Sequence, residues 1–387
     1  MSRAIESAAE MPKAWRAARR ILAVRLDNLG DVLMTTPALA AIRHALPGSH
    51  ISLLSSPGSA MLSGHLPDVD AFIPFEAPWM KAGAGCPPGP GWLESMATQL
   101  RAMAFDAAII FTVCTQSPLP AAMLCMMAGI PLRLAHCREN PYALLSDWVP
   151  DHEVVEHGMR HEVARQLALV ARVGMQTPSN RLRFAFAADD EASLKQLMAA
   201  EGLGPAADYF VVHVGASAAS RRYPAALFGA AANLIAARSG ALAVFTGSSA
   251  EAPLIETARC AMGTPAHSLA GRLRLGELGA LLAGARVLVS NNSGPVHMAA
   301  ALGTPVVDLY ALTNPQHTPW EVPAVVLNED VPCRNCLRSE CPEGHHRCLS
   351  EVRPRRVADA ALALMQAFPD RLQRPAHQAF SQSVEAG

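Results

Sequence analysis

The feature that most constrains the fold of this chain is an alternation of apolar strand patterns and helical patterns, which occurs in both halves. In the first half, strand patterns occupy 20–26, 50–56, 71–75, 105–112 and 132–136, and helical patterns occupy 31–45, 92–103, 118–128 and 153–173. In the second half, strand patterns occupy 208–217, 241–247, 285–290 and 304–310, and helical patterns occupy 224–238, 250–262, 275–283, 295–302 and 357–368. This alternation predicts an α/β fold with two parallel-sheet domains.

A polar stretch at 175–207 separates the halves, and 387 residues suffice for two domains. The predicted organisation is an N-terminal extension at 1–19, an N-terminal domain at 20–185, a link at 186–207, a C-terminal domain at 208–350 that includes a cysteine cluster at 333–348, and a C-terminal helix and tail at 351–387. Open parallel sheets bind ligands at the carboxyl ends of their strands, so we expect the two domains to face a central cleft.

Composition indicates an ordinary globular protein, with 51% hydrophobic residues and 17% charged residues. The net charge of −1 argues against bulk nucleic-acid binding. No apolar run reaches 18 residues, and the first 20 residues lack a signal-peptide core, so we expect a cytoplasmic protein. Lys13, Arg16, Arg19 and Arg20 fit an ordinary surface helix, or a peripheral contact with the inner face of an anionic membrane.

The most informative single motif runs from Asn291 to His297, between an apolar strand pattern and a helix of small residues. Gly294 permits a tight turn, and Pro295 suits the first helical position. We expect Ser293 or Asn292 to cap the helix. A helix start of this kind presents backbone N–H groups that favour a phosphate, although an ordinary strand–turn–helix explains an isolated match equally well.

Two further turns follow strands in the same way. Gly30 lets the backbone approach a ligand, and Asp31 lies in the first turn of the next helix, where it stabilises the helix or acts as a general base. In the second half, Gly215 and Ser217 leave room for a ligand, and Arg221 is suited to pairing with phosphate oxygens.

These motifs resemble those of family 9 glycosyltransferases, the ADP-heptose:lipopolysaccharide heptosyltransferases. The resemblance spans roughly 20–350 and rests on RLDNLGDVLMTTPALAAIRHALPGSHISLL, GAS…RRYP and NNSGPVHMAAALGTPVVDLYALTNPQHTPW. The segment ECPEGHHRC is most similar to heptosyltransferase II members. The resemblance implies a GT-B fold of two Rossmann-like domains and a reaction that requires no cofactor. It also implies an ADP-L-glycero-β-D-manno-heptose donor on the C-terminal domain and a lipid A–Kdo core or related glycan acceptor on the N-terminal domain.

The resemblance also implies roles for individual residues. Asp31 matches the proposed base of an inverting displacement, and Arg221 matches a position where a donor-binding Lys is common. The donor-phosphate turn and its histidine correspond to Ser293, Gly294, Pro295 and His297. Two departures stand out, because Asn292 replaces a frequent Asp and Ala311 replaces a usual Gly, and both bear on donor preference.

Several alternatives stay open from the sequence alone. The acceptor is a core glycan, another glycan or a protein, and acceptor contacts are expected from the loops at 76–91 and 113–120. A nucleotide-sugar epimerase and a non-catalytic nucleotide-sugar-binding module are compatible with the same architecture.

Four cysteines near the C-terminus form the pattern C-x2-C-x4-C-x6-C, and they are Cys333, Cys336, Cys341 and Cys348. Their spacing fits a structural Zn²⁺ or iron site, and equally fits reduced thiols or local disulfides in a surface loop. The other five cysteines are scattered, which indicates a reducing compartment.

Overall fold

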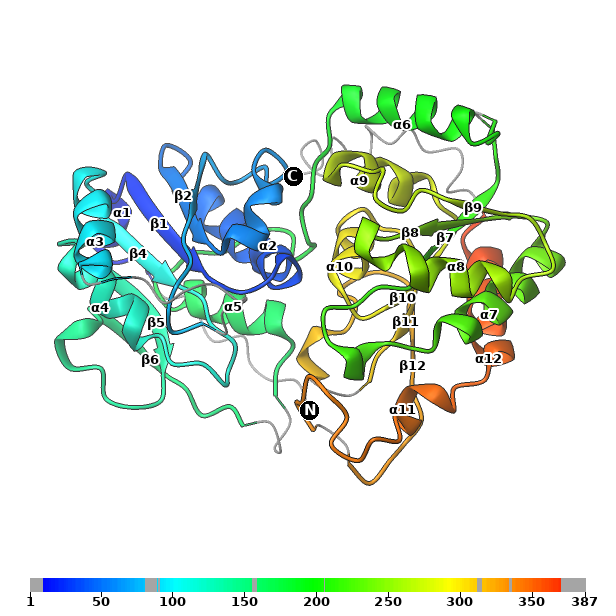
Figure 1. Ribbon diagram of the computed structural model, residues 1–387. Helices are drawn as coiled ribbons and strands as arrows, with labels where there is room; N and C mark the ends of the chain where they lie inside the picture. Colours follow the sequence, from blue (N-terminus) through cyan, green and yellow to red (C-terminus); the bar gives the residue numbers. More distant parts are fainter. Residues whose placement is uncertain are drawn as a thin grey trace. The chain divides into compact units, whose positions relative to one another are not determined.

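The computed structural model describes residues 10–80, 89, 91–154, 159–204, 206–311, 315–333 and 336–369. The chain divides into two compact units, Met1–Arg181 and Leu182–Gly387. Each unit contains a six-stranded parallel sheet with helices on both faces, which confirms the predicted α/β fold of two Rossmann-like domains (Figure 1).

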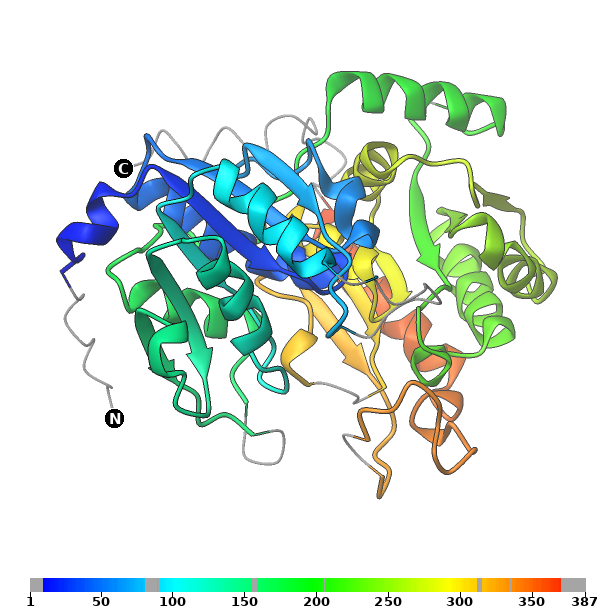
Figure 2. The ribbon, with the colours of Figure 1, turned by 60° about the vertical axis from the view of Figure 1, so that its left-hand side comes forward.

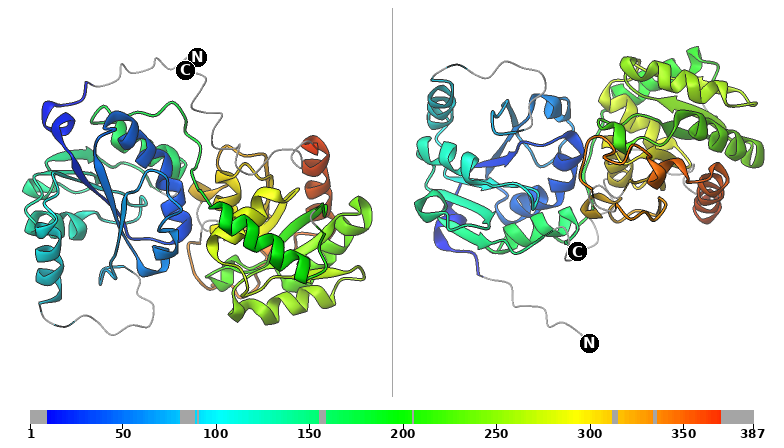
Figure 3. Two further views of the ribbon diagram at one scale, coloured as in Figure 1. Left: turned by 90° about the horizontal axis from the view of Figure 1, so that it is seen from above. Right: turned by 60° about the horizontal axis from the view of Figure 1, so that its bottom comes forward.

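The sheet of the first unit has the strand order β3-β2-β1-β4-β5-β6. Its strands are β1 (Arg20–Arg25), β2 (His50–Ser55), β3 (Ala71–Pro74), β4 (Ala107–Ile110), β5 (Leu132–Cys137) and β6 (Asp147–Pro150). The main helices are α2 (Leu29–Ala45), α3 (Trp92–Ala102), α4 (Leu119–Met127) and α5 (Glu162–Ala171). Helices α3 and α4 cover one face and α2 and α5 the other, so the central strands are buried on both sides (Figure 3).

The sheet of the second unit has the order β12-β11-β10-β7-β8-β9. Its strands are β7 (Tyr209–His213), β8 (Leu242–Thr246), β9 (Ala266–Ser268), β10 (Leu288–Asn291), β11 (Val306–Leu309) and β12 (Ala324–Leu327). The helices are α6 (Ala188–Ala200), α7 (Ala225–Ser239), α8 (Ala252–Cys260), α9 (Leu275–Gly284), α10 (Gly294–Ala301), α11 (Arg347–Ser350) and α12 (Pro354–Ala367). Helices α7, α8 and α12 share one apolar core with the sheet, and α6 packs on α9 (Figure 2).

Both units have the same strand order when their strands are counted along the chain, namely 3-2-1-4-5-6. The direction of winding reverses between the first and fourth strands, which are β1 and β4 in one unit and β7 and β10 in the other. Ligands of doubly wound folds bind at the carboxyl ends of these two strands. The fold therefore singles out two short segments in each unit as candidates for chemistry.

The structure differs from the sequence prediction mainly at the sheet edges. Strands β6, β9 and β12 were not predicted, because each has only three or four residues and lies at or near an edge. The predicted helix at 153–173 was too long, since α5 begins at Glu162, where the His161 ring accepts the Val163 N–H. Residues 155–158 of that prediction lie outside the described residues.

The described part of the N-terminal extension contains helix α1 (Lys13–Ala17), which is docked on the first unit. Trp15 is 1% exposed, and its indole N–H donates to the Asp147 carboxylate over 3.1 Å. Lys13 and Arg16 lie on the exposed side of this helix. No helix in the described ranges combines the length and apolar character needed to cross a membrane.

Candidate active site

Asp31 lies where α2 begins, directly after the carboxyl end of β1. It is the third residue of the helix, and its carboxylate accepts the Asn28 backbone N–H over 3.2 Å. This confirms the predicted place of Asp31 in the first helical turn, whereas Gly30, expected in the turn before the helix, is the second residue of α2. The Asp31 side chain is 14% exposed, so it caps the helix without being closed off from solvent.

A buried arginine, Arg25, forms an ion pair with Asp31. Arg25, the last residue of β1, is fully buried, and its guanidinium lies 3.5 Å from an Asp31 carboxylate oxygen. The same guanidinium pairs with Asp27 at 2.9 Å and with Glu162 of α5 at 2.7 Å. Gln166 donates a further hydrogen bond to Glu162 over 2.6 Å. The Arg25 guanidinium therefore pairs with three carboxylates, and these contacts restrict the rotamers of all three acidic side chains.

Sequence reasoning missed this network. Burial raises the pKa of Asp27 to about 6, although Arg25 opposes the shift. The signal available in the sequence was a charged residue, Arg25, at the end of an otherwise apolar strand. A side chain there must find buried partners, but nothing local identifies Glu162 as one of them.

The turn between β10 and α10 contains the predicted phosphate site of the second unit. Ser293 is extended at the helix N-terminus, and Gly294 and Pro295 are the first two helical residues. The expected cap was wrong, because the Ser293 hydroxyl donates to the Asn291 carbonyl over 3.1 Å. Asn292 does not cap the helix either, since its amide donates to Asp308 and to the His317 carbonyl. The first N–H groups of α10 thus receive no side-chain cap from these residues.

Asn291 connects this turn to the neighbouring strand. Its amide donates to the Val214 carbonyl over 2.8 Å and accepts the Tyr223 N–H over 2.8 Å. The ends of β10 and β7 are therefore fastened together. His297, one turn into α10, is 3% exposed and lies within the packed body of the unit.

The turn after β7 is tighter than the sequence suggested. A Cβ atom on Gly215 would lie 1.9 Å from an oxygen of Glu251, so that carboxylate already occupies the space above the glycine. Glu251 is held there by the Ser248 N–H over 2.7 Å. Ser217, further along the turn, is exposed. Glu251 is a polar group of this site that sequence reasoning missed.

The two adjacent arginines of the second unit differ in their partners. Arg222 donates to the Ala216 carbonyl over 2.8 Å and so supports the turn. The Nε of Arg221 is buried and, among the described residues, has no hydrogen-bond partner. A buried N–H without a partner is costly, and an anionic ligand would satisfy it.

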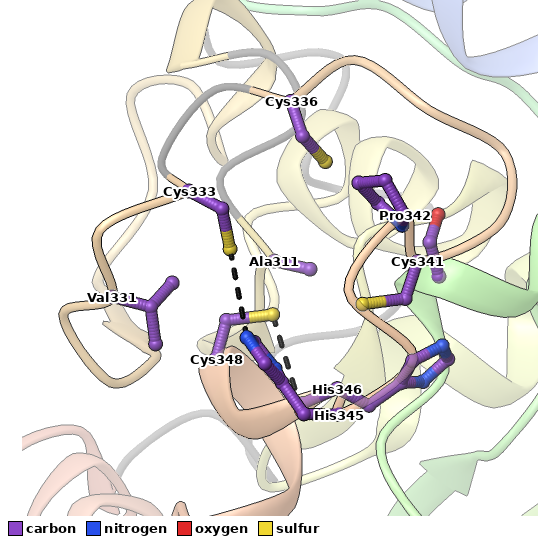
Figure 4. A pocket seen from close by; sticks show the side chains of 10 residues that line it. Ala311, Val331, Cys333, Cys336, Cys341, Pro342, His345, His346 and Cys348 are labelled. Carbon is purple, nitrogen blue, oxygen red and sulfur yellow. Dashed lines mark hydrogen bonds between the residues drawn. The ribbon is translucent and has the colours of Figure 1, made fainter.

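The four clustered cysteines are free thiols that line one small pocket together with His345 and His346 (Figure 4). The Cys333 sulfur lies 3.9 Å from Nε2 of His345. Within the described ranges, however, no three Cys, His, Asp or Glu side chains converge closely enough to hold a metal ion. The geometry therefore does not support the Zn²⁺ or iron site that the spacing suggested.

The loop that contains the four clustered cysteines instead forms hydrogen bonds with the turn that carries Arg221. The Ser220 hydroxyl donates to the Arg338 carbonyl over 2.6 Å, and the Ser220 N–H donates to the Ser339 carbonyl over 3.1 Å. Ala311, one of the two departures from the family pattern, forms part of the same pocket wall. The loop thus fixes the residue that precedes Arg221.

The profile of glycosyltransferase family 9 (heptosyltransferase) matches residues 93–347, which is more than half of the chain. The chain belongs to glycosyltransferase family 9. This confirms the resemblance drawn from the motifs and makes the chain a glycosyltransferase of the heptosyltransferase type.

Relatives of known name agree with this family assignment. Lipopolysaccharide heptosyltransferase 1 of Pseudomonas aeruginosa is 26% identical over 89% of this chain and 98% of its own length. Lipopolysaccharide heptosyltransferase 2 of Escherichia coli is 24% identical over the same shares of the two chains.

Two solved structures show the same GT-B fold. The family 9 glycosyl transferase of Veillonella parvula has a TM-score of 0.75 and 22% identity, and covers 94% of this chain and 100% of its own. The ADP-heptose lipopolysaccharide heptosyltransferase II of E. coli has a TM-score of 0.70 and 22% identity, and covers 90% and 99%.

Proposed function

We propose that this family 9 enzyme transfers heptose, with inversion, from ADP-L-glycero-β-D-manno-heptose to a sugar of the lipopolysaccharide inner core. The heptosyltransferase names of its full-length relatives support the reaction class. The observation that carries the proposal is the Asp31 carboxylate at the carboxyl edge of β1, held by a fully buried cation. A carboxylate fixed in this way is suited to receive a proton from an acceptor hydroxyl.

The proposed reaction is a single displacement. Asp31 takes the proton of an acceptor hydroxyl as that oxygen forms a bond to the anomeric carbon of the donor. The bond from this carbon to the β-phosphate oxygen breaks, and its electron pair leaves with ADP. Attack opposite to the leaving group inverts the anomeric centre. Arg25 holds the Asp31 carboxylate in place for this step, with its guanidinium 3.5 Å from a carboxylate oxygen.

In the second unit we assign the departing ADP to Arg221 and the first turn of α10. Negative charge develops on the leaving phosphate, where a guanidinium and backbone N–H groups stabilise it. The absence of a side-chain cap from Ser293 at the start of α10, and the Nε of Arg221, which is buried without a partner among the described residues, support this assignment. Each step uses side chains and backbone groups of the chain itself.

We place the enzyme at the cytoplasmic side of the membrane, where a lipid-linked acceptor is exposed. The basic residues Lys13 and Arg16 are exposed on the docked helix α1, where Arg16 forms an exposed ion pair with Glu10 at 3.3 Å, and they suit a weak contact with anionic lipid. Flotation with phosphatidylglycerol vesicles tests this contact. Loss of flotation in a Lys13→Glu/Arg16→Glu variant is expected, and equal flotation of this variant would contradict the contact.

The transfer itself is tested by ADP release from ADP-heptose in the presence of a core-oligosaccharide acceptor. Asp31→Asn should lower kcat about a thousandfold, within the range typical of a lost general base, while the donor KM stays within about threefold. Asp189→Asn on the exposed face of α6 is the matched control and should leave kcat unchanged.

Two outcomes would favour the alternatives. Conversion of the donor sugar without an acceptor, seen by NMR, would indicate an epimerase. Donor binding that persists in Asp31→Asn, with no turnover of any nucleotide-sugar by the natural protein, would indicate a binding module.

A further inference from the structure

Helix α4 of the first unit has no polar face. All nine of its residues, LPAAMLCMM, are apolar, and its inner side, which includes Leu124 and Cys125, is buried in the core between the sheet and the helices α3 and α4. The outer side presents Met123 and Met126, which are 43% and 45% exposed. A helix at the surface of a globular unit ordinarily carries polar residues on its outer side, so this apolar side indicates a contact with another apolar surface.

Two aromatic side chains extend the apolar surface of α4. Tyr142 lies in a short turn of 3₁₀ helix that contacts α4, and it is 84% exposed. Trp148 of β6 is 40% exposed and is paired with Ala135, which belongs to the core under α4, so its indole lies on the α4 side of the sheet. Tyr and Trp side chains are enriched where proteins meet the boundary between water and lipid. The α4 surface, as we call it, consists of Met123, Met126, Tyr142 and Trp148.

Arginines border the α4 surface at the amino edge of the sheet, where α4 ends. The Arg101 guanidinium donates to the carbonyl of Met127, the last residue of α4. Arg133, near the start of β5, donates to the Leu144 carbonyl over 2.8 Å, and Arg20, at the start of β1, donates to the Met103 carbonyl over 2.7 Å. Carbonyl oxygens orient these guanidiniums without neutralising them, and among the described residues none of the three forms an ion pair.

The carboxylates of the same edge do not balance this charge. Asp106 accepts the backbone N–H groups of Arg19 and Arg20 over 2.7 and 2.8 Å, and Asp147 accepts the Trp15 indole N–H. Helix α1 adds its basic residues to the edge, since the Arg19 guanidinium donates to the Arg16 carbonyl over 3.2 Å. The cationic side chains at this edge, which we call the basic edge, are Lys13, Arg16, Arg19, Arg20, Arg101 and Arg133.

We propose that the α4 surface docks on a bilayer that contains anionic lipid, with its methionines and aromatic rings among the headgroups and the basic edge against the lipid phosphates. Charge selects this occupant, because a symmetric pair of chains would bring two basic edges together, whereas lipid phosphates neutralise them. The proposal rests on the membrane-side placement in the proposed function, in which α1 makes the contact, but it does not depend on the transfer reaction.

The test is flotation of the full chain with vesicles made of equal parts phosphatidylcholine and phosphatidylglycerol, without donor or acceptor. Pure phosphatidylcholine vesicles should bind the natural protein about tenfold more weakly, because the headgroups lose their net charge. Met123→Gln/Met126→Gln should lower the partition into the mixed vesicles about tenfold, since two apolar side chains no longer enter the lipid. Tyr142 has a φ of +48°, which Asn tolerates, so Tyr142→Asn keeps the turn and should lower the partition about threefold.

Met61→Gln is the matched control. Met61 is 57% exposed and belongs to the 3₁₀ segment Pro57–Leu62, which contacts α2 on the other face of the sheet. This variant should float like the natural protein. Far-UV circular dichroism and thermal unfolding establish that the variants of the α4 surface are folded, and ADP release with a soluble core-oligosaccharide acceptor should be the same in all of them.

Equal flotation of Met123→Gln/Met126→Gln and the natural protein would overturn the proposal, and so would equal binding to the two kinds of vesicle. A dimer of the natural protein in analytical ultracentrifugation that dissociates in this double variant would also overturn it, because a second copy would then cover the α4 surface. Loss of flotation in this variant but not in Lys13→Glu/Arg16→Glu would support the α4 surface and contradict the contact through α1. Flotation as expected, with no ADP release by the natural protein, would refute the proposed transfer and leave the docking surface standing.

Discussion

The side-chain amide of Asn292 donates to the buried carboxylate of Asp308 over 2.9 Å. The same nitrogen donates to the His317 carbonyl over 2.8 Å, so both amide hydrogens are used inside the second unit. Asn292 therefore stabilises the turn between β10 and α10 by two internal hydrogen bonds. The family pattern frequently has Asp at this position, and in this chain an Asp there would face Asp308.

Asn292→Asp should destabilise the protein, because it places two carboxylates against each other in a buried site. We expect a loss of roughly 2–4 kcal/mol in the free energy of unfolding at pH 8, measured by urea denaturation. The double variant Asn292→Asp/Asp308→Asn exchanges the two groups and should recover most of this loss. The exposed Asn140→Asp serves as control. A single variant as stable as the natural protein would contradict the pairing.

Asp308 should also make stability depend on pH. Burial raises its pKa from 3.8 to about 7, so its contribution to stability is complete below its unfolded pKa and is lost as the pH rises through about 7. Asp308→Asn should therefore gain stability relative to the natural protein at pH 8, by roughly 1–3 kcal/mol more than at pH 5. Urea titrations at the two pH values measure this difference. The same gain at both pH values would show that Asp308 does not titrate in this range.

Arg25 should be required for stability as well as for activity. Arg25→Met leaves three carboxylates without their cation and should cost roughly 3–5 kcal/mol of unfolding free energy. The double variant Arg25→Met/Glu162→Gln removes one of the uncompensated charges, so it should regain part of the stability but none of the ADP release. Recovery of activity in the double variant would show that Arg25 acts only through folding.

Arg221 should contribute to the transfer and little to stability, because its Nε has no hydrogen-bond partner in the described structure. Arg221→Ala should lower kcat/KM for the donor about a hundredfold, and Arg221→Lys should lower it less, since a charge remains. Both variants should unfold at the temperature of the natural protein. Arg238→Ala, a half-exposed arginine on α7, is the matched control for ADP release. Unchanged kinetics in Arg221→Ala would remove this residue from the site.

The sequence was sufficient to predict the elements that carry strong patterns. Long apolar runs and small-residue helices predicted the central strands and most helices, and the residues that follow β1, β7 and β10 were correctly assigned to their turns. Local chemistry suffices there, because a strand end, a glycine and a helix start are adjacent along the chain. The edge strands β6, β9 and β12 were missed because three or four partly exposed residues carry little periodicity, whereas the edge strand β3 was predicted from the apolar run at 71–75.

The long-range contacts that position the side chains of the candidate site could not be predicted from local sequence patterns. Arg25 and Glu162 are 137 residues apart, and Asn291 reaches Val214 across 77 residues. The failed cap at Ser293 has a local origin instead, because the Asn291 carbonyl, two residues earlier, accepts the hydrogen bond of its hydroxyl in place of the helix. The cysteine spacing likewise indicates proximity but does not specify how the thiols point.

Each unit is one continuous stretch of chain, and the division falls between Arg181 and Leu182. The proposed base, Asp31, is encoded before this point, and the proposed donor-phosphate residues Arg221, Ser293 and Gly294 are encoded after it. A single genetic crossover near codon 181 would therefore exchange the unit that contains the proposed base and leave the unit that contains the proposed phosphate-binding residues unchanged.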